Sequence, residues 1–160
     1  GVGHFDCAMD NINKHGLQDV IREMALEMKK PFLGICLGMQ LMCNSSEEGN
    51  LPGLGYIKGH VKRLDDSKLY QKPKLPHMGW NSIVKNKESV LFENIDTEVG
   101  FYFLHSYYFE CENISDILAT TQYGETFASA VCHENVYGIQ FHPEKSHHNS
   151  ISLLKNYSRL

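Results

Sequence analysis

Residues 31–43, PFLGICLGMQLMC, join a short apolar run to a segment with helical spacing and place one cysteine between two glycines. Phe32 to Ile35 are apolar on both sides, as strands buried in a parallel sheet are, and predict a short strand. A helix is predicted from about Leu37 to Cys43. A sharp turn between a strand and a helix, with small residues two positions on either side, can present a side chain at the top of a sheet. The stretch therefore predicts an α/β fold with Cys36 at the exposed turn.

The rest of the chain fits the same fold class, an α/β fold with a mixed, mostly parallel sheet flanked by helices. A stripe of apolar residues at helical spacing predicts a helix over 17–28 that covers one face of the sheet: Leu17, Val20, Ile21, Met24 and Met28. Residues 44–58 are polar and glycine-rich, which predicts a long loop with a functional role. Alternating segments between turn signals then predict strands, followed by a closing helix: strands at 59–64, 81–84, 101–109, 117–122, 126–132 and 136–141, and a helix at 149–157.

Composition narrows the class of protein. The chain has 160 residues, 42% of them hydrophobic, which is enough for one domain with a real core, and we expect a single domain over 1–160. A net charge of −4 with scattered Lys and Arg argues against nucleic acid as a partner. No apolar stretch approaches the roughly 18 residues of a membrane span. We therefore expect no membrane contact and a cytoplasmic location.

The cysteines and the first residues give two further expectations. The five cysteines are widely spaced without a CxxC pair, so we expect reduced thiols, no metal site and no cofactor. The chain starts at Gly1 with GVGHFD, loop-like where a domain normally begins with a strand or a cap. We therefore expect the sequence to be incomplete at its N-terminus.

A base for the Cys36 thiol is predicted from residues 140–146, QFHPEKS. Pro143 favours an extended His142, so the side chains of His142 and Glu144 are expected on the same side. Histidine can take a thiol proton as general base while a carboxylate orients its ring. Each residue alone has a structural alternative: a buried cysteine that packs as a small hydrophobe, a histidine at a strand end, and a solvated acid. The combination favours a Cys–His–Glu triad over a metal site with His147 and His148.

These motifs, GICLGMQL with FHPE, resemble the class I, or triad, glutamine amidotransferases, which release ammonia from glutamine through a cysteinyl thioester. The resemblance covers the whole chain and implies a flavodoxin-like fold, here without its first strand and helix. It assigns the nucleophile to Cys36, the base to His142 and the orienting acid to Glu144. It also implies an oxyanion hole and contacts to the glutamine substrate: Val2 and Leu37 for the first, and Gln40, Glu48, Ser106 and Tyr107 for the second.

Five further stretches resemble one branch of that family, which supplies ammonia in histidine biosynthesis: SEEG (46–49), GLGYIKGHVKR (53–63), PHMGWN (76–81), FYFLHSYY (101–108) and FHPEKS (141–146). The branch resemblance implies a heterodimer with a (β/α)8-barrel cyclase that receives the ammonia. Trp80 and Asn81 match positions that face the cyclase, with a core tryptophan as the alternative.

Three other functions stay open from the sequence. The stretch His147-His148-Asn149 departs from the histidine branch and, with GVGHFD, is similar to a paralogous branch. In that branch the ammonia amidates a nucleotide-linked sugar for surface polysaccharides. An inactive scaffold that only docks a barrel partner is a second alternative, although all three triad residues are present. A papain-like protease is a third, but its cysteine lies in another local signature.

Overall fold

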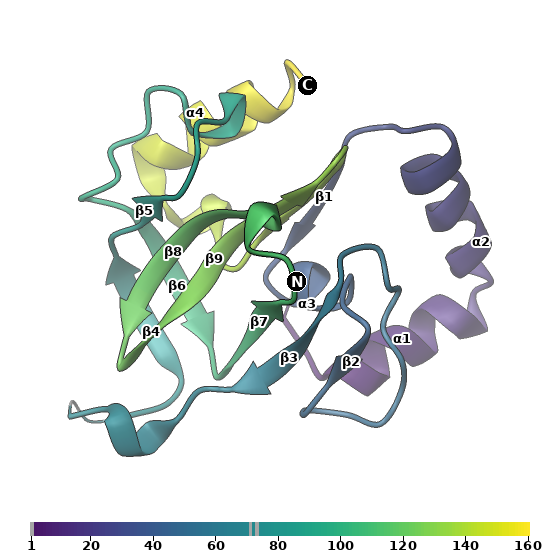
Figure 1. Cartoon of the computed structure of the whole chain (residues 1–160), viewed down its shortest axis with the longest axis horizontal. Helices are drawn as coiled ribbons and strands as arrows, with labels where there is room; N and C mark the ends of the chain where they lie inside the picture. The colour runs from purple at the N-terminus through teal and green to yellow at the C-terminus, as the bar shows by residue number, and fades with distance from the viewer. Residues whose placement is uncertain (1, 71, 73) are drawn as a thin grey trace.

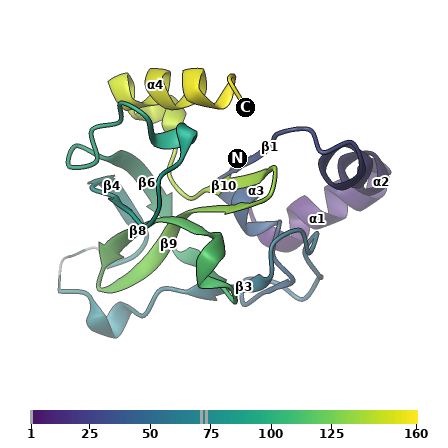
Figure 2. The same ribbon diagram turned by 45° about the horizontal axis from the view of Figure 1, so that its top comes forward.

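The computed structural model describes residues 2–70, 72 and 74–160. Helices lie on both sides of a twisted mixed sheet, with α1 and α2 at one side and α4 at the other (Figures 1 and 2). The α-helices are α1 (Phe5–Lys14), α2 (Leu17–Arg22), α3 (Leu37–Gln40) and α4 (His147–Tyr157), and a π-helical turn, Glu23–Glu27, continues α2. The strands are β1 (Phe32–Ile35), β2 (Ser45–Ser46), β3 (Gly59–Arg63), β4 (His77–Asn81), β5 (Val84–Lys85), β6 (Phe101–His105), β7 (Tyr107–Cys111), β8 (Ile117–Tyr123), β9 (Glu125–His133) and β10 (Val136–Ile139). Short 3-10 turns cover Asp66–Lys68, Val90–Phe92, Ile114–Asp116 and Pro143–Lys145.

The sheet is mixed, as the sequence predicts. Its order is β1-β10-β9-β7-β3-β2, with β8 against β9 and β5 against β8, and β4 pairs separately with β6. The expectation of mostly parallel strands does not hold within the described residues, where β1–β10 and β2–β3 are parallel and the remaining pairs are antiparallel. The reason is that β8, β9 and β10 follow one another through tight turns, and a tight turn joins only antiparallel strands.

Two apolar clusters fill the two faces of the sheet. One lies under α1 and contains Phe5, Met9, Met39 and Phe109, and the other lies under α4 and includes Leu153. Side chains alternate between the clusters along the strands, because successive residues of a strand point to opposite faces. The sheet is therefore buried on both sides, as an α/β fold requires.

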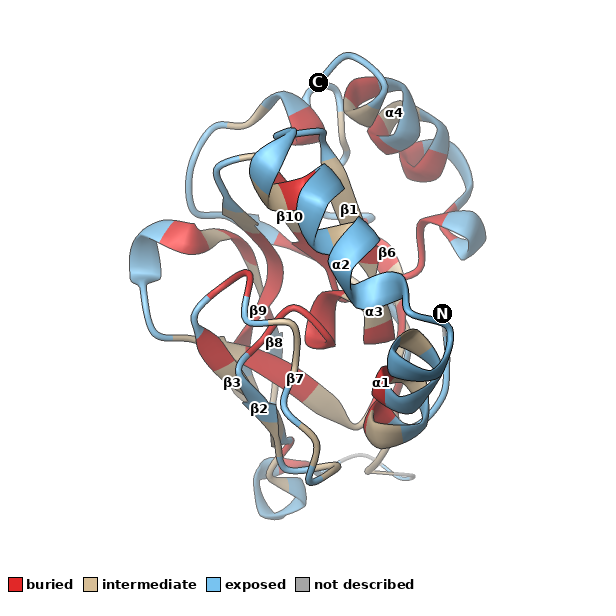
Figure 3. Cartoon of the chain, turned by 90° about the vertical axis from the view of Figure 1, so that its right-hand side faces the viewer, coloured by how far each residue is buried: buried red, intermediate tan, exposed pale blue. Residues whose placement is uncertain are grey.

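The segment 17–28 is helical as predicted, but the apolar stripe does not cover the sheet. Leu17, Val20, Met24 and Met28 are each about half exposed, and Figure 3 shows the outward side of α2 as exposed. Ala25 of the π-helical turn is the fully buried residue of this segment, and Asn135 donates to its carbonyl oxygen at 2.7 Å. In the π-helical turn the N–H of Met28 bonds to Glu23 O, five residues back. Ile21 of the predicted stripe packs against the core together with Ala25 and Leu26, so the packed face coincides only in part with the predicted one.

Other boundaries also differ from the prediction; the strand predicted for 136–141, for example, ends at Ile139. Helix α1 was not predicted. The helix predicted for 37–43 ends at Gln40, and the strand predicted for 101–109 divides at Ser106 into β6 and β7. Instead of the strand predicted at 81–84, the chain has β4, which ends at Asn81, and β5, which begins at Val84. Helix α4 begins at His147, two residues earlier than predicted.

Candidate active site

Cys36 occupies a strained turn between β1 and α3. Its backbone has φ 53° and ψ −109°, a region that non-glycine residues rarely adopt, and its N–H donates to Ile139 O at 2.8 Å. Such conformations cost about 1–3 kcal/mol and concentrate at functional sites. Gly34 is required here, since a Cβ at that position would lie 2.5 Å from Gly38 O. A Cβ on Gly38 would meet open space, so only the first of the two predicted small neighbours is needed sterically.

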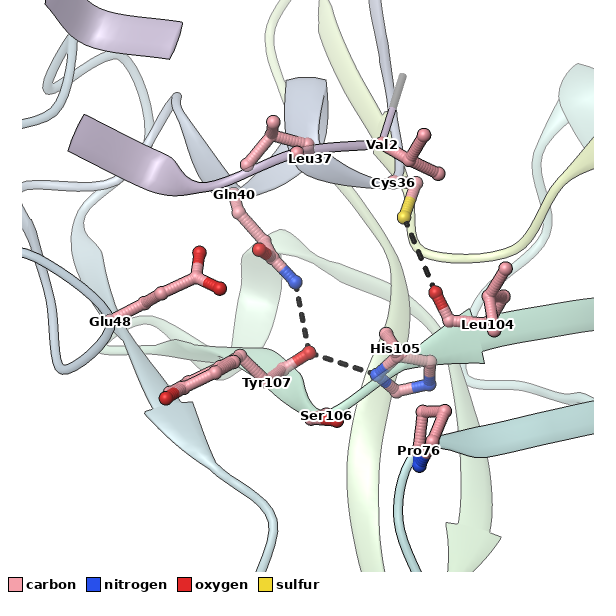
Figure 4. A pocket seen from close by; sticks show the side chains of 11 residues that line it. Val2, Cys36, Leu37, Gln40, Glu48, Pro76, Leu104, His105, Ser106 and Tyr107 are labelled. Atoms are coloured by element: carbon pink, nitrogen blue, oxygen red, sulfur yellow. Dashed lines mark hydrogen bonds between the residues drawn. The ribbon is translucent and has the colours of Figure 1, made fainter. Parts of the chain in front are cut away.

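A cavity of about 270 Å³ opens at this turn, and Figure 4 shows the side chains around it. The structure brings together at this cavity the residues that the sequence predicts for the oxyanion hole and for substrate contact: Val2, Leu37, Gln40, Glu48, Ser106 and Tyr107. Val2 is exposed at the mouth of the cavity. Gly1, which precedes it in the predicted oxyanion element, lies outside the described residues.

The Cys36 thiol is buried and weakly hydrogen-bonded. Its Sγ lies 3.8 Å from Leu104 O, to which it donates, and 3.6 Å from the Nε2 of Gln140, which donates to the sulfur. Burial raises the pKa of this thiol, and the Leu37 N–H and the Gln140 amide offset only part of that rise. The start of α3 thus lowers the pKa of Cys36 through the Leu37 N–H, but burial outweighs that contribution. The thiol needs a base to lose its proton.

His142 and Glu144 form the expected pair just after β10. The Nδ1–H of His142 donates to Glu144 Oε1 at 2.7 Å, and the backbone N–H of His142 donates to Tyr102 O at 2.8 Å. Burial works to raise the pKa of Glu144, but the hydrogen bond and charge of His142 bring it below its usual value. A carboxylate on Nδ1–H leaves Nε2 with a free lone pair, which is the acceptor that a general base needs.

His142 is not among the residues that line the cavity, although the charge of its partner Glu144 acts on the Cys36 thiol. Within the described residues no hydrogen bond joins Cys36 Sγ to His142, and His142 Nε2 is buried without a hydrogen-bond partner. A buried nitrogen without a partner is costly and is found where chemistry uses it. Hydrogen bonds between nucleophile and base are often long or absent in free enzymes and form with substrate.

Gln40 and Glu48 have structural contacts as well as positions in the cavity. Gln40 is 5% exposed, and its Nε2 donates to Tyr107 O at 2.8 Å and to Gln140 Oε1 at 3.1 Å. Gln40 is therefore a buried residue of the cavity wall and not an exposed helical residue. Glu48 Oε2 accepts the N–H of Phe5 at 3.0 Å, so this acid caps α1.

Site residues that the sequence did not predict include Pro76, Leu104 and His105, which line the cavity, and Gln140, which contacts the Cys36 sulfur. Gln140 lies two residues before His142 and therefore on the same side of an extended segment, which is a signal that could have found it. His105 is adjacent to Ser106 in the quoted LHSYY stretch. The contact of Leu104 is made by its backbone oxygen, so the residue type at this position could not predict it.

The two residues predicted to face a partner lie outside the cavity on β4. Trp80 is 44% exposed, and its ring stacks on His147 with centroids 5.5 Å apart. The alternative of a core tryptophan is therefore excluded. Asn81 points to the other face of β4, where its Nδ2 donates to Gln122 O at 3.0 Å.

The remaining chemistry of the chain is simple. All five cysteines are free thiols. Over residues 2–70, 72 and 74–160, no group of three or more His, Cys, Asp or Glu side chains has the arrangement of a metal site. No helix in that part of the chain has the length and apolar character to cross a membrane.

Comparison with known proteins points to one family. The family model of glutamine amidotransferase class-I matches residues 11–158. The imidazole glycerol phosphate synthase subunit HisH of Leptospira borgpetersenii is 45% identical over 160 residues, which cover all of this chain and 78% of that protein. The protein of the same name from Bdellovibrio bacteriovorus is 46% identical over the same shares.

Solved structures share the fold at low sequence identity. A putative GMP synthase protein from Thermoplasma acidophilum superposes with a TM-score of 0.65 at 17% identity, covering 96% of this chain and 65% of that one. A glutamine amidotransferase from Thermotoga maritima gives 0.63 at 18% identity, covering 99% of this chain and 59% of that one. The mixed sheet with its flanking helices is the fold of these proteins.

Proposed function

The chain belongs to the class I glutamine amidotransferase family, and we propose that it is the glutaminase subunit of imidazole glycerol phosphate synthase, which supplies ammonia in histidine biosynthesis. The observation that carries the proposal is the strained Cys36 at a cavity, in a chain that also holds an oriented His142–Glu144 pair. The relatives that cover 98–100% of the chain at 41–49% identity support the branch.

The proposed reaction starts when His142 Nε2 takes the Cys36 proton and the sulfur attacks the side-chain amide carbon of glutamine. The carbonyl oxygen becomes an oxyanion facing the N–H groups of Leu37 and Val2, and one such donor lowers a barrier by roughly 3 kcal/mol in other enzymes. The carbon–nitrogen bond breaks as the imidazolium returns the proton to the leaving nitrogen, which departs as ammonia.

The remaining thioester is hydrolysed in the same way. His142 takes a proton from water, the hydroxide attacks the thioester carbon, and the carbon–sulfur bond breaks. The sulfur recovers a proton, and glutamate leaves. Glu144 stays ionised throughout, because its lowered pKa keeps it a carboxylate that stabilises the imidazolium.

We propose a (β/α)8-barrel cyclase as the partner and the cytoplasm as the location. Ammonia becomes protonated in water and loses its nucleophilicity, so direct transfer to a second protein chain favours a heterodimer. The exposed Trp80 on β4 is the residue we assign to that interface.

Glutamate release from glutamine tests the proposal. The protein is assayed alone, with a histidine-pathway cyclase and its nucleotide ligand, and with a barrel partner from the sugar-amidating branch. We expect stimulation by the cyclase. Stimulation only by the second partner moves the function to polysaccharide assembly, and a bound partner without any glutamate release makes the chain an inactive scaffold.

A further inference from the structure

Two buried histidines next to the cavity have no role in the proposed reaction. His77 on β4 and His105 on β6 face each other in the register of the two strands and are 3% and 6% exposed. The His77 ring lies between Phe103 and Tyr123, with centroids 4.7 Å and 4.0 Å away and interplanar angles of 22° and 26°. Aromatic packing explains why a ring fits at this position, but it does not explain why the ring carries nitrogen.

The nitrogens belong to a hydrogen-bond chain that begins at Asn81. The Asn81 Nδ2 donates to the carbonyl oxygen of Gln122 at 3.0 Å and lies 3.2 Å from His77 Nε2. His77 Nδ1 is 3.0 Å from His105 Nε2, and His105 Nδ1 is 2.8 Å from Tyr107 O.

The two ends of the chain fix its direction. A carbonyl can only accept, so Asn81 presents its NH₂ group at one end and His105 presents an N–H at the other. His77 Nε2 is then an acceptor, and His77 carries its proton on Nδ1. His105 accepts that proton on Nε2 and carries its own on Nδ1, so every bond in the chain has one donor and one acceptor.

The chain also requires both rings to be neutral, since a charged ring would bring two N–H groups face to face. Burial lowers the pKa of His77 to about 4. Burial, and then the proximity of His77, lower the pKa of His105 to about 3. Both rings are therefore neutral at physiological pH, as the chain demands.

The last acceptor of the chain is part of the cavity wall. Tyr107 O also accepts from Gln40 Nε2 at 2.8 Å, and Figure 4 shows both bonds meeting at this oxygen. Gln40 in turn bonds to Gln140, whose Nε2 reaches the Cys36 sulfur. The Tyr107 carbonyl oxygen thus accepts hydrogen bonds from both His105 and Gln40.

We propose that Asn81, His77 and His105 form a positioning relay that fixes the Tyr107 carbonyl, and through it Gln40, for glutamine binding. The inference rests on the proposed function for its substrate and assigns these residues a role that acts through the Tyr107 carbonyl. It gives Asn81 an inward role, distinct from the outward Trp80 on the same strand.

Two variants of His77 separate the relay from simple packing. His77→Gln can accept from Asn81 and donate to His105 but loses the ring, whereas His77→Phe keeps the ring between Phe103 and Tyr123 but breaks the relay. We expect His77→Phe to raise the KM for glutamine roughly tenfold, the value of one lost hydrogen bond, with kcat little changed. His77→Gln should stay within about twofold of the parent protein, as should His133→Phe at an exposed site as a matched control. A functional Phe variant with a defective Gln variant would overturn the proposal and assign His77 to packing.

Nitrogen NMR of histidine-labelled protein tests the relay without any activity. His77 and His105 should both show the neutral tautomer with the proton on Nδ1 from pH 7 to pH 5. A proton on Nε2 of either ring contradicts the relay, even if a variant fails to fold. If the parent protein releases no glutamate with any partner, the proposed function fails, while the tautomers still decide whether the relay exists.

Discussion

Replacing Gln140 by methionine, which has a similar volume and no amide, tests how the buried Cys36 thiol becomes reactive. Gln140 is fully buried, and its Nε2 is the side-chain donor that reaches the sulfur, at 3.6 Å. A donor stabilises the thiolate more than the thiol, so the amide holds the pKa of Cys36 lower than burial alone would set it. In Gln140→Met the pKa of Cys36 rises further.

The size of the effect follows from one hydrogen bond to a charged group, about 1.5–3 kcal/mol in proteins. The distance of 3.6 Å places this bond at the weak end of that range. About 1.4 kcal/mol corresponds to a factor of ten, so the thiolate fraction at pH 7 should fall roughly tenfold.

The assay is alkylation of Cys36 by iodoacetamide as a function of pH, read from the Cys36 peptide by mass spectrometry. Gln140→Met should react roughly tenfold more slowly at pH 7, and the difference should vanish at a pH high enough to ionise both thiols. Gln18→Met, at an exposed position of α2, is the matched control and should react as the parent protein does. Equal alkylation of the parent and Gln140→Met at pH 7 would refute the account of the thiol.

Three further predictions concern stability. Gly34→Ala should lower the free energy of unfolding by about 3 kcal/mol in urea, because the new Cβ would lie 2.1 Å from Met42 Cε and 2.5 Å from a backbone oxygen; an unchanged urea midpoint would mean that the turn can relax. Asn149→Ala should cost about 2–4 kcal/mol in the same assay, since the variant loses the bonds from Nδ2 to two backbone oxygens, at 2.7 and 2.8 Å, and the bond that Oδ1 accepts from the Asp96 N–H at 3.2 Å; a loss below 1 kcal/mol, as at an ordinary surface site, would contradict the prediction. His77 and His105 have pKa values of about 4 and about 3 in the folded protein and about 6.5 in the unfolded chain. Between the folded and unfolded values the unfolded chain binds more protons, so the free energy of unfolding falls as the pH drops. Each histidine should remove roughly 2 kcal/mol between pH 7 and pH 5, and equal unfolding free energies at the two pH values would show that the rings are not held neutral.

Local patterns in the sequence predicted the centre of the fold well. The strand at Phe32–Ile35 and the turn at Cys36 depend on neighbours within a few residues. The hairpin of β8 and β9 was visible as a turn signal around Gly124, which has φ 70°. Patterns of this kind depend only on residues that are close in the sequence, so a single sequence is enough to recognise them.

Phe5, Ala8, Met9 and Ile12 have the spacing of an amphipathic helix, which is the signal that could have predicted α1, but its start carries no local cap. His4 makes no side-chain cap, and the N–H of Phe5 is satisfied by Glu48, 43 positions along the chain. Helix α3 ends early for a similar reason: the backbone oxygens of Leu41 and Cys43 accept from residues 54 and 55 of the following loop, and not from a continued helix.

For the site, the residue types predicted the catalytic chemistry but not the burial and hydrogen bonds of the Cys36 thiol. The His142–Glu144 contact follows from their spacing around Pro143. The raised pKa of Cys36 depends on burial by elements from the whole chain, and the contact with Gln140 depends on the pairing of β1 with β10. Tertiary packing therefore decides the state of the thiol.

Covalent labelling by a diazo-ketone analogue of glutamine tests the central claim, that Cys36 is the nucleophile, most directly. The labelled protein is digested, and the modified peptide is identified by mass spectrometry. The account predicts a single label on Cys36, blocked by glutamine, absent from Cys36→Ala and much slower in His142→Asn. A label on Cys43, or labelling that survives in Cys36→Ala, would contradict it.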